Sequence, residues 1–192
     1  MSPRQSDTRQ RVVAAAAEML ARHGLNATSI REMAKRADAP LGSTYHYFPG
    51  GKQQVVVEAV QLAGARIGAS LDHHLPAGAD TGLRNFLAMW RDILLRSDFR
   101  IGCPVLAVAA EEPIDDSAAE ALEAAAQVFR GWEGQLAAAL EKQGRSPAAA
   151  AGLATLIIAG LEGAIVLCRA QRSIEPFDKV AERLEWLVSS HA

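Results

Sequence analysis

The side chains best suited to chemistry in this 192-residue chain are concentrated between Thr28 and Lys52. Hydroxyls, an imidazole and small residues fit contacts with phosphates and base edges in the DNA major groove, because they donate hydrogen bonds and permit close approach. Lys52 adds a cation at the start of a helix, whose first amides are also suited to a phosphate. The candidate DNA contacts are Thr28, Ser29, Arg31, Leu41, Gly42, Ser43, Thr44, Tyr45, His46, Tyr47 and Lys52.

Other chemistries find little support in the sequence. There is no metal-ligand spacing, no glycine-rich phosphate loop after a strand and no recognisable pairing of nucleophile and base, so we expect no enzyme activity, no metal and no cofactor. His73 and His74 are neighbours, and neighbours on a helix point apart. Cys103 and Cys168 are too few for a disulfide framework, which fits a reducing cytoplasm, and the polar N-terminus lacks the apolar core of a signal peptide.

Two short helices are expected to position the candidate DNA contacts as a helix-turn-helix. Ser29 and Glu32 have the spacing of a capping box, which predicts a helix start. The residue before Pro40 is disfavoured in the α region, so this helix ends and a second one, over residues 41–47, begins with the proline in its first turn. The second helix is polar and is the expected recognition helix. The alternative is a small helical hairpin whose tyrosines are core residues.

Helical periodicity continues through the rest of the chain, and we find no strand pattern and no internal repeat. Residues 1–6 are expected to form a disordered arm, and the nearby arginines, Arg4, Arg9 and Arg11, either reach the phosphate backbone or form a solvated run. A loop is expected around Pro76, Gly78 and Gly82. Other helices are expected over about 7–23, 52–74, 81–97, from 104 onward, 117–143, 147–170 and 176–190. The predicted fold class is all-α, with about nine helices.

The composition is that of a soluble globular chain, with 49% hydrophobic residues, 22% charged residues and a net charge of −2. The charge is uneven, because residues 1–60 hold eight Lys/Arg against five Asp/Glu (+3) and the remainder twelve against seventeen (−5). A basic end on an acidic body favours one face docking on DNA. Residues 148–168 are long enough to span a bilayer, but about half of them are Ala or Gly and they include Glu162, which favours a buried helix and no membrane partner.

At the same residues the chain resembles the TetR/AcrR family of transcriptional regulators. Residues 28–34 match the second helix of that family, and residues 45–52 match its Tyr-x-x-Phe-Pro-x-Gly-Lys signature. Asp38 stands where the family usually has Gly, and Leu41 stands where a polar residue is common. Further along, Gly-Cys-Pro at 102–104, a small apolar helix and Glu-Glu at 111–112 are similar to the LmrA/YxaF-like branch.

The resemblance implies a DNA-binding domain at 1–52 and an effector-binding and dimerisation domain at 53–192. It implies a cytoplasmic homodimer on a palindromic operator, acting as a repressor that a small apolar molecule releases. Ordinary core packing is the alternative for the implied pocket residues, and for Glu162 the alternatives are a dimer-interface hydrogen bond or a partly exposed charge. The implied pocket residues are Phe86, Met89, Trp90, Phe99, Cys103, Leu106, Phe129, Trp132 and Glu162.

The helix expected over residues 147–170 is apolar nearly all round, so it needs cover on two sides. Its own core supplies one side, and a second copy would supply the other in a four-helix interface with the last helix, as in the family. The alternative is that its small residues fit a crowded core. The predicted dimer residues are Gly152, Leu156, Ala159, Gly160, Gly163, Phe177, Leu184 and Trp186.

Two other forms of control remain as alternatives. The chain would then be a helix-turn-helix regulator or scaffold that answers to a protein partner, or one that answers to oxidation of Cys103. A cysteine beside a helix N-terminus has a lowered thiol pKa, which favours redox sensing. The competing interpretation of Cys103 is a small buried residue that lines the interior.

Overall fold

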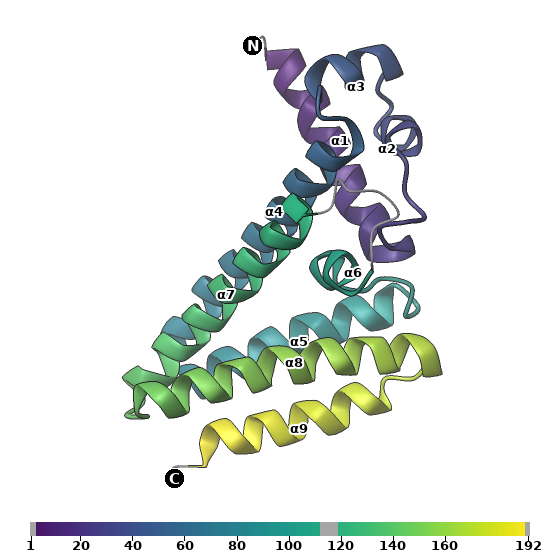
Figure 1. Ribbon diagram of the computed structural model, residues 1–192. Helices are drawn as coiled ribbons and strands as arrows, with labels where there is room; N and C mark the ends of the chain where they lie inside the picture. Colours follow the sequence, from purple (N-terminus) through teal and green to yellow (C-terminus); the bar gives the residue numbers. More distant parts are fainter. Residues whose placement is uncertain (1–2, 112–118, 191–192) are drawn as a thin grey trace. The chain divides into compact units, whose positions relative to one another are not determined.

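The computed structural model describes residues 3–111 and 119–190, with side chains described from Asp7 onward. Within these ranges all of the regular structure is helical, in nine α-helices and one short 3₁₀ turn, η1 (Figure 1). The prediction of an all-α chain is therefore confirmed. Residues 112–118, where the expected helix from 117 begins, lie outside the described ranges.

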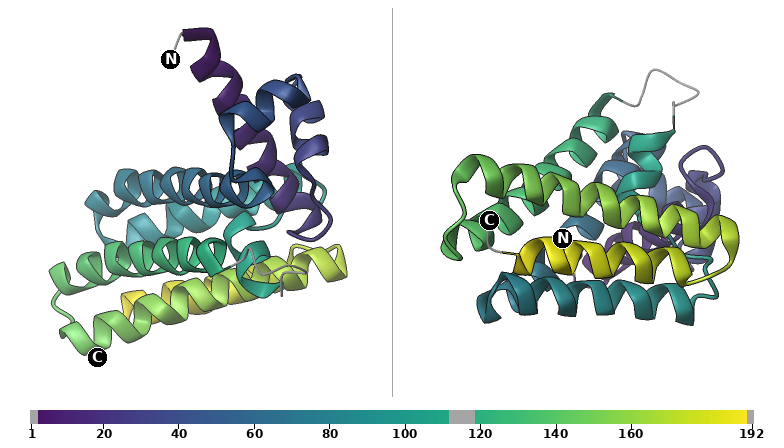
Figure 2. Two further views of the ribbon diagram at one scale, coloured as in Figure 1. Left: turned by 45° about the horizontal axis from the view of Figure 1, so that its top comes forward. Right: turned by 90° about the horizontal axis from the view of Figure 1, so that it is seen from below.

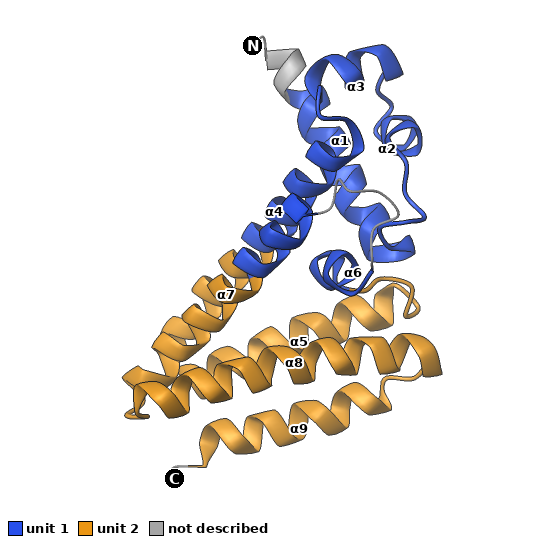
Figure 3. Cartoon of the chain, viewed as in Figure 1, with its two compact units in different colours: residues 1–65, 103–128 blue, residues 66–102, 129–192 orange. Residues whose placement is uncertain are grey.

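The chain divides into two compact units (Figure 3). Unit 1 contains residues 1–65 and 103–128, and unit 2 contains residues 66–102 and 129–192. Residues 103–128 join the N-terminal unit because helix α6 (Pro104–Ala110) packs on helix α1 (Pro3–His23). Compactness does not decide which residues bind DNA or an effector, so the domains at 1–52 and 53–192 stay a prediction.

Unit 1 is built around α1, which begins at Pro3 rather than at Asp7 because proline is tolerated in the first turn of a helix. Its other elements are α2 (Ile30–Arg36), α3 (Leu41–Tyr47), the first part of α4 (Gly51–His74), α6 and the first part of α7 (Ala119–Lys142). Both α2 and α3 pack on α1. The fully buried side chains of this core include Val12, Ala16, Leu20, Met33, Phe48 and Val55.

Local signals set the boundaries of α2 and α3. The Ser29 hydroxyl accepts the backbone N–H of Glu32 at 3.2 Å, which confirms one half of the expected capping box. Asp38, between the two helices, has φ +49°, a left-handed conformation that favours glycine and that Asp and Asn tolerate better than most residues. Pro40 immediately precedes α3 instead of lying inside its first turn, and its carbonyl accepts the N–H of Thr44 at 3.0 Å.

Unit 2 contains the end of α4, η1 (Leu75–Ala77), α5 (Ala79–Arg96), the second part of α7, α8 (Pro147–Gln171) and α9 (Glu175–Ser189). Helices α5, α8 and α9 lie side by side (Figure 2). The predicted start of α8 is confirmed, because Ser146 caps it by accepting the N–H of Ala149 at 3.3 Å and Pro147 occupies its first turn.

Helix α8 is long and apolar enough to cross a membrane, and no other described helix meets that test of length and composition. Its apolar residues divide between two faces. One face packs into unit 2 through residues such as Ile157, Leu161 and Ile165, whereas Leu156 and Val166 are about half exposed. This pattern is that of a core helix with one uncovered side.

Gly82 lies inside α5 and not in the loop that its neighbourhood of Pro and Gly predicts. A Cβ at this position would lie 2.8 Å from the Cα of Leu75 and 3.0 Å from the carbonyl oxygen of His74. Both are backbone atoms, so they cannot move aside as a flexible side chain would. The glycine therefore allows η1 to fold closely against the start of α5.

Replacing Gly82 by Ala should lower the free energy of unfolding by about 1–3 kcal/mol, the usual cost of overpacking a close contact. Gly131→Ala is the matched control, because a Cβ at Gly131 of α7 would meet nothing within 4 Å. That control should be neutral or more stable by about 0.5–1 kcal/mol, since alanine favours a helix interior over glycine. Urea unfolding followed by circular dichroism measures both, and equal effects of the two substitutions would contradict the close approach at Gly82.

Candidate nucleic-acid interface

Helix α3 presents a polar face to solvent. Gly42, Tyr45 and His46, which are three and four residues apart, are exposed, and the side chain of Tyr45 is 52% accessible. Ser43 and Tyr47 are half-buried beside them, and the His46 and Tyr47 rings meet edge to face with centroids 5.7 Å apart. The alternative in which both tyrosines are core residues is therefore wrong for Tyr45. Leu41 is half-buried at the start of the helix.

Two predicted DNA contacts are buried instead. Thr28 is 3% exposed, and its hydroxyl donates to the carbonyl of Leu25 at 2.7 Å. Thr44 is fully buried, and its hydroxyl donates to the carbonyl of Pro40 at 3.1 Å. Both hydroxyls bond to nearby backbone carbonyls, Thr28 just before α2 and Thr44 in the first turn of α3. The sequence does not distinguish this common use of threonine from ligand contact.

The stretch from Phe48 to Lys52 turns the chain from α3 into α4. Phe48 is fully buried, and the Arg9 guanidinium lies over its ring at 5.1 Å from the centroid. Gly51 has φ +62°, which a residue with a side chain rarely adopts, and its N–H donates to the Phe48 carbonyl at 2.9 Å. Lys52 then lies half-buried in the first turn of α4, close in sequence to the amides at that helix's start.

Arg9 and Arg11 make contacts within the protein, which is neither of the two roles that the sequence left open for them. Arg9 packs on Phe48 and pairs with Glu58, so it belongs to the fold of unit 1. Arg11 donates to the Asp38 carbonyl at 3.3 Å and pairs with Asp7. Ser29 and Arg31 are exposed on the α2 side and stay available to a phosphate.

Glu18 of α1 pairs with Arg36 of α2 and so holds α2 against α1. Arg36 donates to both oxygens of its carboxylate, from Nε at 3.2 Å and also from Nη2, and Arg22 Nε donates at 3.0 Å. The hydrogen bond from Arg36 is the main reason that the pKa of Glu18 lies below its ordinary value. A lowered carboxyl pKa stabilises the fold above the unfolded-state pKa, and that contribution is lost as the pH falls through the folded-state value.

Glu111, at the end of α6, holds the turn between α1 and α2. Its carboxylate accepts the backbone N–H groups of Leu25 and Asn26, each at 2.9 Å. A Cβ at Gly24, where φ is +82°, would lie 1.9 Å from the Glu111 Oε1, so only glycine leaves room for this contact. Sequence reasoning noted Glu111 only as part of a family-like pair, because its partners lie about 85 residues away in the chain.

The predicted effector-pocket residues fall in both units. Cys103 and Leu106 belong to unit 1, where the Cys103 sulfur is buried and accepts the Leu106 N–H at 3.5 Å. The unit 2 members Phe86, Trp90, Trp132 and Glu162 are buried, while Met89, Phe99 and Phe129 are half-buried.

Particular contacts distinguish some of these unit 2 residues. The Phe129 and Trp132 rings meet edge to face at 5.5 Å, and the Arg172 guanidinium lies 5.9 Å from the Phe99 centroid. Among the described residues the buried indole Nε1 of Trp90 has no hydrogen-bond partner. A buried donor without a partner costs free energy, so it is a place where a bound acceptor would stabilise the protein.

The predicted dimer residues also separate into two groups. Gly152, Leu156, Ala159, Gly163 and Trp186 are exposed, and the side chain of Trp186 is 61% accessible. The structure instead places Phe177 and Leu184 in the core of unit 2, and Gly160 faces the same core, where a Cβ would meet Val180 at 3.4 Å and Leu184 at 3.5 Å. These three residues pack α9 on α8 of the same chain. Val166 and Leu167, which the sequence reasoning missed, extend the exposed face.

Comparison with known proteins identifies this arrangement. The sequence pattern described as "Bacterial regulatory proteins, tetR family" matches residues 12–59, and "Transcriptional regulator LmrA/YxaF-like, C-terminal domain" matches residues 79–183. An uncharacterised HTH-type transcriptional regulator of Mycobacterium tuberculosis is 38% identical over 186 residues, covering 94% of this chain and 93% of that protein. The uncharacterised HTH-type transcriptional regulator YxaF of Bacillus subtilis is 27% identical over 186 residues, covering 96% of each chain.

The fold agrees with this assignment. The crystal structure of regulatory protein TetR from Rhodobacter sphaeroides superposes with a TM-score of 0.81 at 23% identity, over 92% of this chain and 96% of that one. The predicted resemblance to the TetR/AcrR family and its LmrA/YxaF-like branch is confirmed. The relatives are transcriptional regulators, which agrees with the prediction that the chain is not an enzyme.

The contact between Glu111 and the α1–α2 turn predicts non-additive mutations. Glu111→Ala removes a charged acceptor from two backbone amides and should lower the free energy of unfolding by about 1–3 kcal/mol. Gly24→Ala should cost a similar amount, because its Cβ displaces the same carboxylate and its φ is positive. The double variant should be less destabilised than the sum by about 1 kcal/mol, measured by urea unfolding, since both changes break the same hydrogen bonds. Additive effects would show that Gly24 and Glu111 act separately.

Proposed function

The chain belongs to the TetR family of bacterial transcriptional regulators, and we propose that it is a cytoplasmic homodimeric repressor, released from a palindromic operator by a small apolar molecule. The observation that carries this proposal is the exposed polar face of α3, held outward by the buried Thr44 and Phe48. A seven-residue helix with three of its seven residues exposed is suited to a groove and poorly suited to a core.

On the proposed operator α3 lies in the major groove. Gly42 permits close approach, and Tyr45 and His46 reach base edges or phosphates from the same face. Ser43 and Tyr47 flank that face, and Leu41 contributes apolar contact at the end nearest Pro40. Ser29, Arg31 and Lys52 contact the sugar-phosphate backbone on either side, which sets the register of the helix without reading sequence.

The proposed dimer face is the exposed stripe of α8, with Trp186 of α9 beside it. Leu156, Val166 and Leu167 are each about half accessible, and small residues at 152, 159 and 163 lie on the same side of the helix. A contiguous apolar stripe of this kind marks an interaction surface. A two-fold axis through it pairs α8 and α9 with their copies, and a dimer places its recognition helices roughly 34–36 Å apart on successive turns of the duplex.

The proposed effector binds among the predicted pocket residues of unit 2, with the Trp90 indole as a donor for a polar atom of the ligand. An effector that favours a conformation with the wrong helix spacing lowers operator affinity about 5–150-fold for a coupling of about 1–3 kcal/mol. Control by Cys103 oxidation is the less favoured alternative, because the sulfur is buried and caps α6. The other cysteine is no better suited, since burial raises the pKa of the Cys168 thiol.

The proposed phosphate contact of Lys52 predicts a change in salt dependence. Lys52→Ala should weaken operator binding and reduce the slope of log affinity against log salt concentration by about one unit for each half-site. With one phosphate contact fewer, the protein releases fewer counterions when it binds DNA. Arg84→Ala, which removes an exposed cation from α5 of unit 2, should leave the slope unchanged. Electrophoretic mobility shifts at several salt concentrations measure both variants. An unchanged slope in the Lys52 variant would show that Lys52 makes no phosphate contact.

The proposed dimer face predicts that Leu156→Arg produces a monomer. Two arginines near the two-fold axis would bring like charges together in an apolar interface, which costs several kcal/mol. Sedimentation analysis should show dissociation, and operator affinity should fall with it. Leu95→Arg is the matched control, since Leu95 of α5 is comparably exposed and lies outside the proposed face. If the Leu156 variant stays dimeric and binds DNA normally, the interface lies elsewhere.

A further inference from the structure

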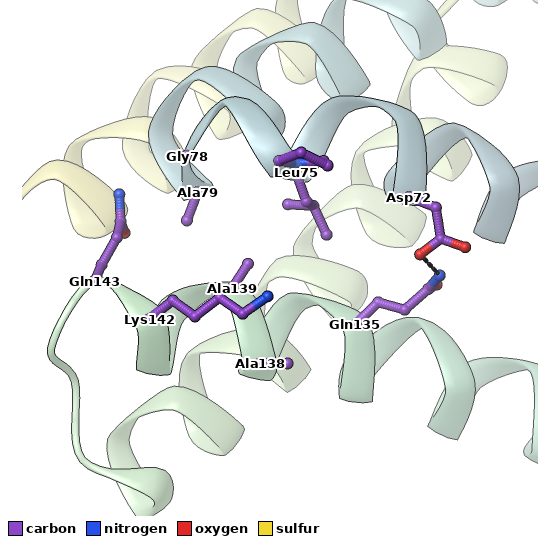
Figure 4. Close-up of a pocket in the computed structure, with 10 residues that line it drawn as sticks. Asp72, Leu75, Gly78, Ala79, Gln135, Ala138, Ala139, Lys142 and Gln143 are labelled. Carbon is purple, nitrogen blue, oxygen red and sulfur yellow. Dashed lines mark hydrogen bonds between the residues drawn. The ribbon is translucent and has the colours of Figure 1, made fainter.

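A groove in unit 2 lies outside every site considered so far. It has a volume of about 560 Å³, within the range of small-molecule sites, and it lies between the end of α4, η1 and the start of α5 on one side and α7 on the other (Figure 4). None of the nine predicted pocket residues lines it. The lining residues are Asp72, Leu75, Pro76, Gly78, Ala79, Gln135, Ala138, Ala139, Lys142 and Gln143.

The groove is open because the side chains that face it are small. Helix α7 buries its large residues, Trp132, Leu136 and Leu140, in the core, and it presents Ala138 and Ala139 to the groove. On the opposite wall, Gly82 allows η1 to fold close to α5, so Leu75 and Pro76 are held back against their own wall. The result is an apolar middle section formed by leucine, proline and alanine.

Each end of the groove is fixed by a glutamine that donates to an aspartate, Gln135 of α7 at one end and Gln143, directly after α7, at the other. At one end the Gln135 amide donates to Asp72 at 2.6 Å and to the Gly68 carbonyl at 3.1 Å. At the other end the Gln143 amide donates to Asp80 at 2.8 Å, and Asp80 also accepts the Ser189 hydroxyl at 2.8 Å. Because these bonds join the two walls, the groove is formed before any ligand enters.

Lys142 is the one cation among the residues that line the groove. Its side chain extends along the groove (Figure 4), and within the described part of the chain its ammonium has no ion-pair partner. The one lining carboxylate, Asp72, keeps its negative charge but is held at the Gln135 end of the groove by that amide. A ligand that complements this lining therefore needs an anionic group for Lys142 and an apolar body for the middle section.

We propose that this groove binds a small anionic amphiphile with a single hydrocarbon chain. Its carboxylate pairs with Lys142, and its chain lies on Leu75, Pro76, Ala138 and Ala139. Burial of the hydrocarbon supplies most of the affinity, because Lys142 is exposed and an exposed ion pair contributes little. Binding in this groove does not depend on the proposed function, whereas any action of the bound anion as an effector rests on it.

Isothermal titration calorimetry with decanoate tests the site in the full-length protein, with 1-decanol and decyltrimethylammonium as the neutral and cationic counterparts. Decanoate should bind at one site per chain and more tightly than the cation. Ala139→Leu should weaken binding at least tenfold by filling the middle section, and Ala88→Leu, at an exposed position of α5, should not. Unchanged decanoate binding by the Ala139 variant would overturn the proposal, since the ligand would then bind elsewhere.

Lys142→Gln provides a second test that does not depend on repacking. It should weaken decanoate binding about two- to fivefold, the range expected for an exposed ion pair, and leave decanol binding unchanged. Lys179→Gln, which removes an exposed cation of α9, is the control. Equal losses for decanoate and decanol, tighter binding of the cation, or no binding of decanoate would each contradict an anion site.

A mobility shift with the operator, with and without decanoate, keeps this proposal separate from the proposed function. If decanoate binds the groove and the operator complex is unaffected, the site stands and its role as an effector site fails. If the protein binds no operator at all, the repressor proposal fails and the calorimetry still decides the site.

Discussion

A polar helix of seven residues is not stable by itself, so the orientation of α3 depends on the residues that anchor it. Thr44 and Phe48, one turn apart, are both fully buried and hold the inner side of the helix. The turn that follows needs the positive φ of Gly51, which starts α4 directly after the anchor. The exposed face at Gly42, Tyr45 and His46 is therefore a consequence of what is buried behind it. The family signature at residues 45–52 contains Phe48, the turn at Gly51 and the first cation of α4, Lys52.

The parts of the fold that the sequence predicted are those set by short-range chemistry. Ser29 caps a helix, and the start of α3 follows from Pro40, because each of these effects acts within about one helical turn. Gly82 and Glu111 could not be predicted, since one depends on a backbone approach from η1 and the other on amides about 85 residues away. From residue type alone, a glycine is expected in a loop and a glutamate is expected to be a solvated surface charge.

The same limit explains the mixed outcome for hydroxyls and aromatic residues. Thr28 and Thr44 have the residue type of a DNA contact, but their hydroxyls bond to backbone carbonyls three and four residues earlier. Tyr45 has the residue type of a core aromatic and is exposed. A pattern of residue types identifies the segment that is proposed to bind DNA. Burial then decides which side chains of that segment are accessible to a ligand.

The small residues of α8 and α7 show why one residue type serves opposite purposes. Gly160 faces α9 of the same chain, whose side chains lie in van der Waals contact with a Cβ at that position, whereas Gly152 and Gly163 have nothing within 4 Å of a Cβ and leave a side of α8 uncovered. On α7, Ala138 and Ala139 leave a groove that two Gln–Asp hydrogen bonds keep open at its ends. A small residue in a packed contact contributes to stability, and one that faces open space provides room for a partner. The distinction lies in the neighbouring elements, which is why it requires the three-dimensional structure.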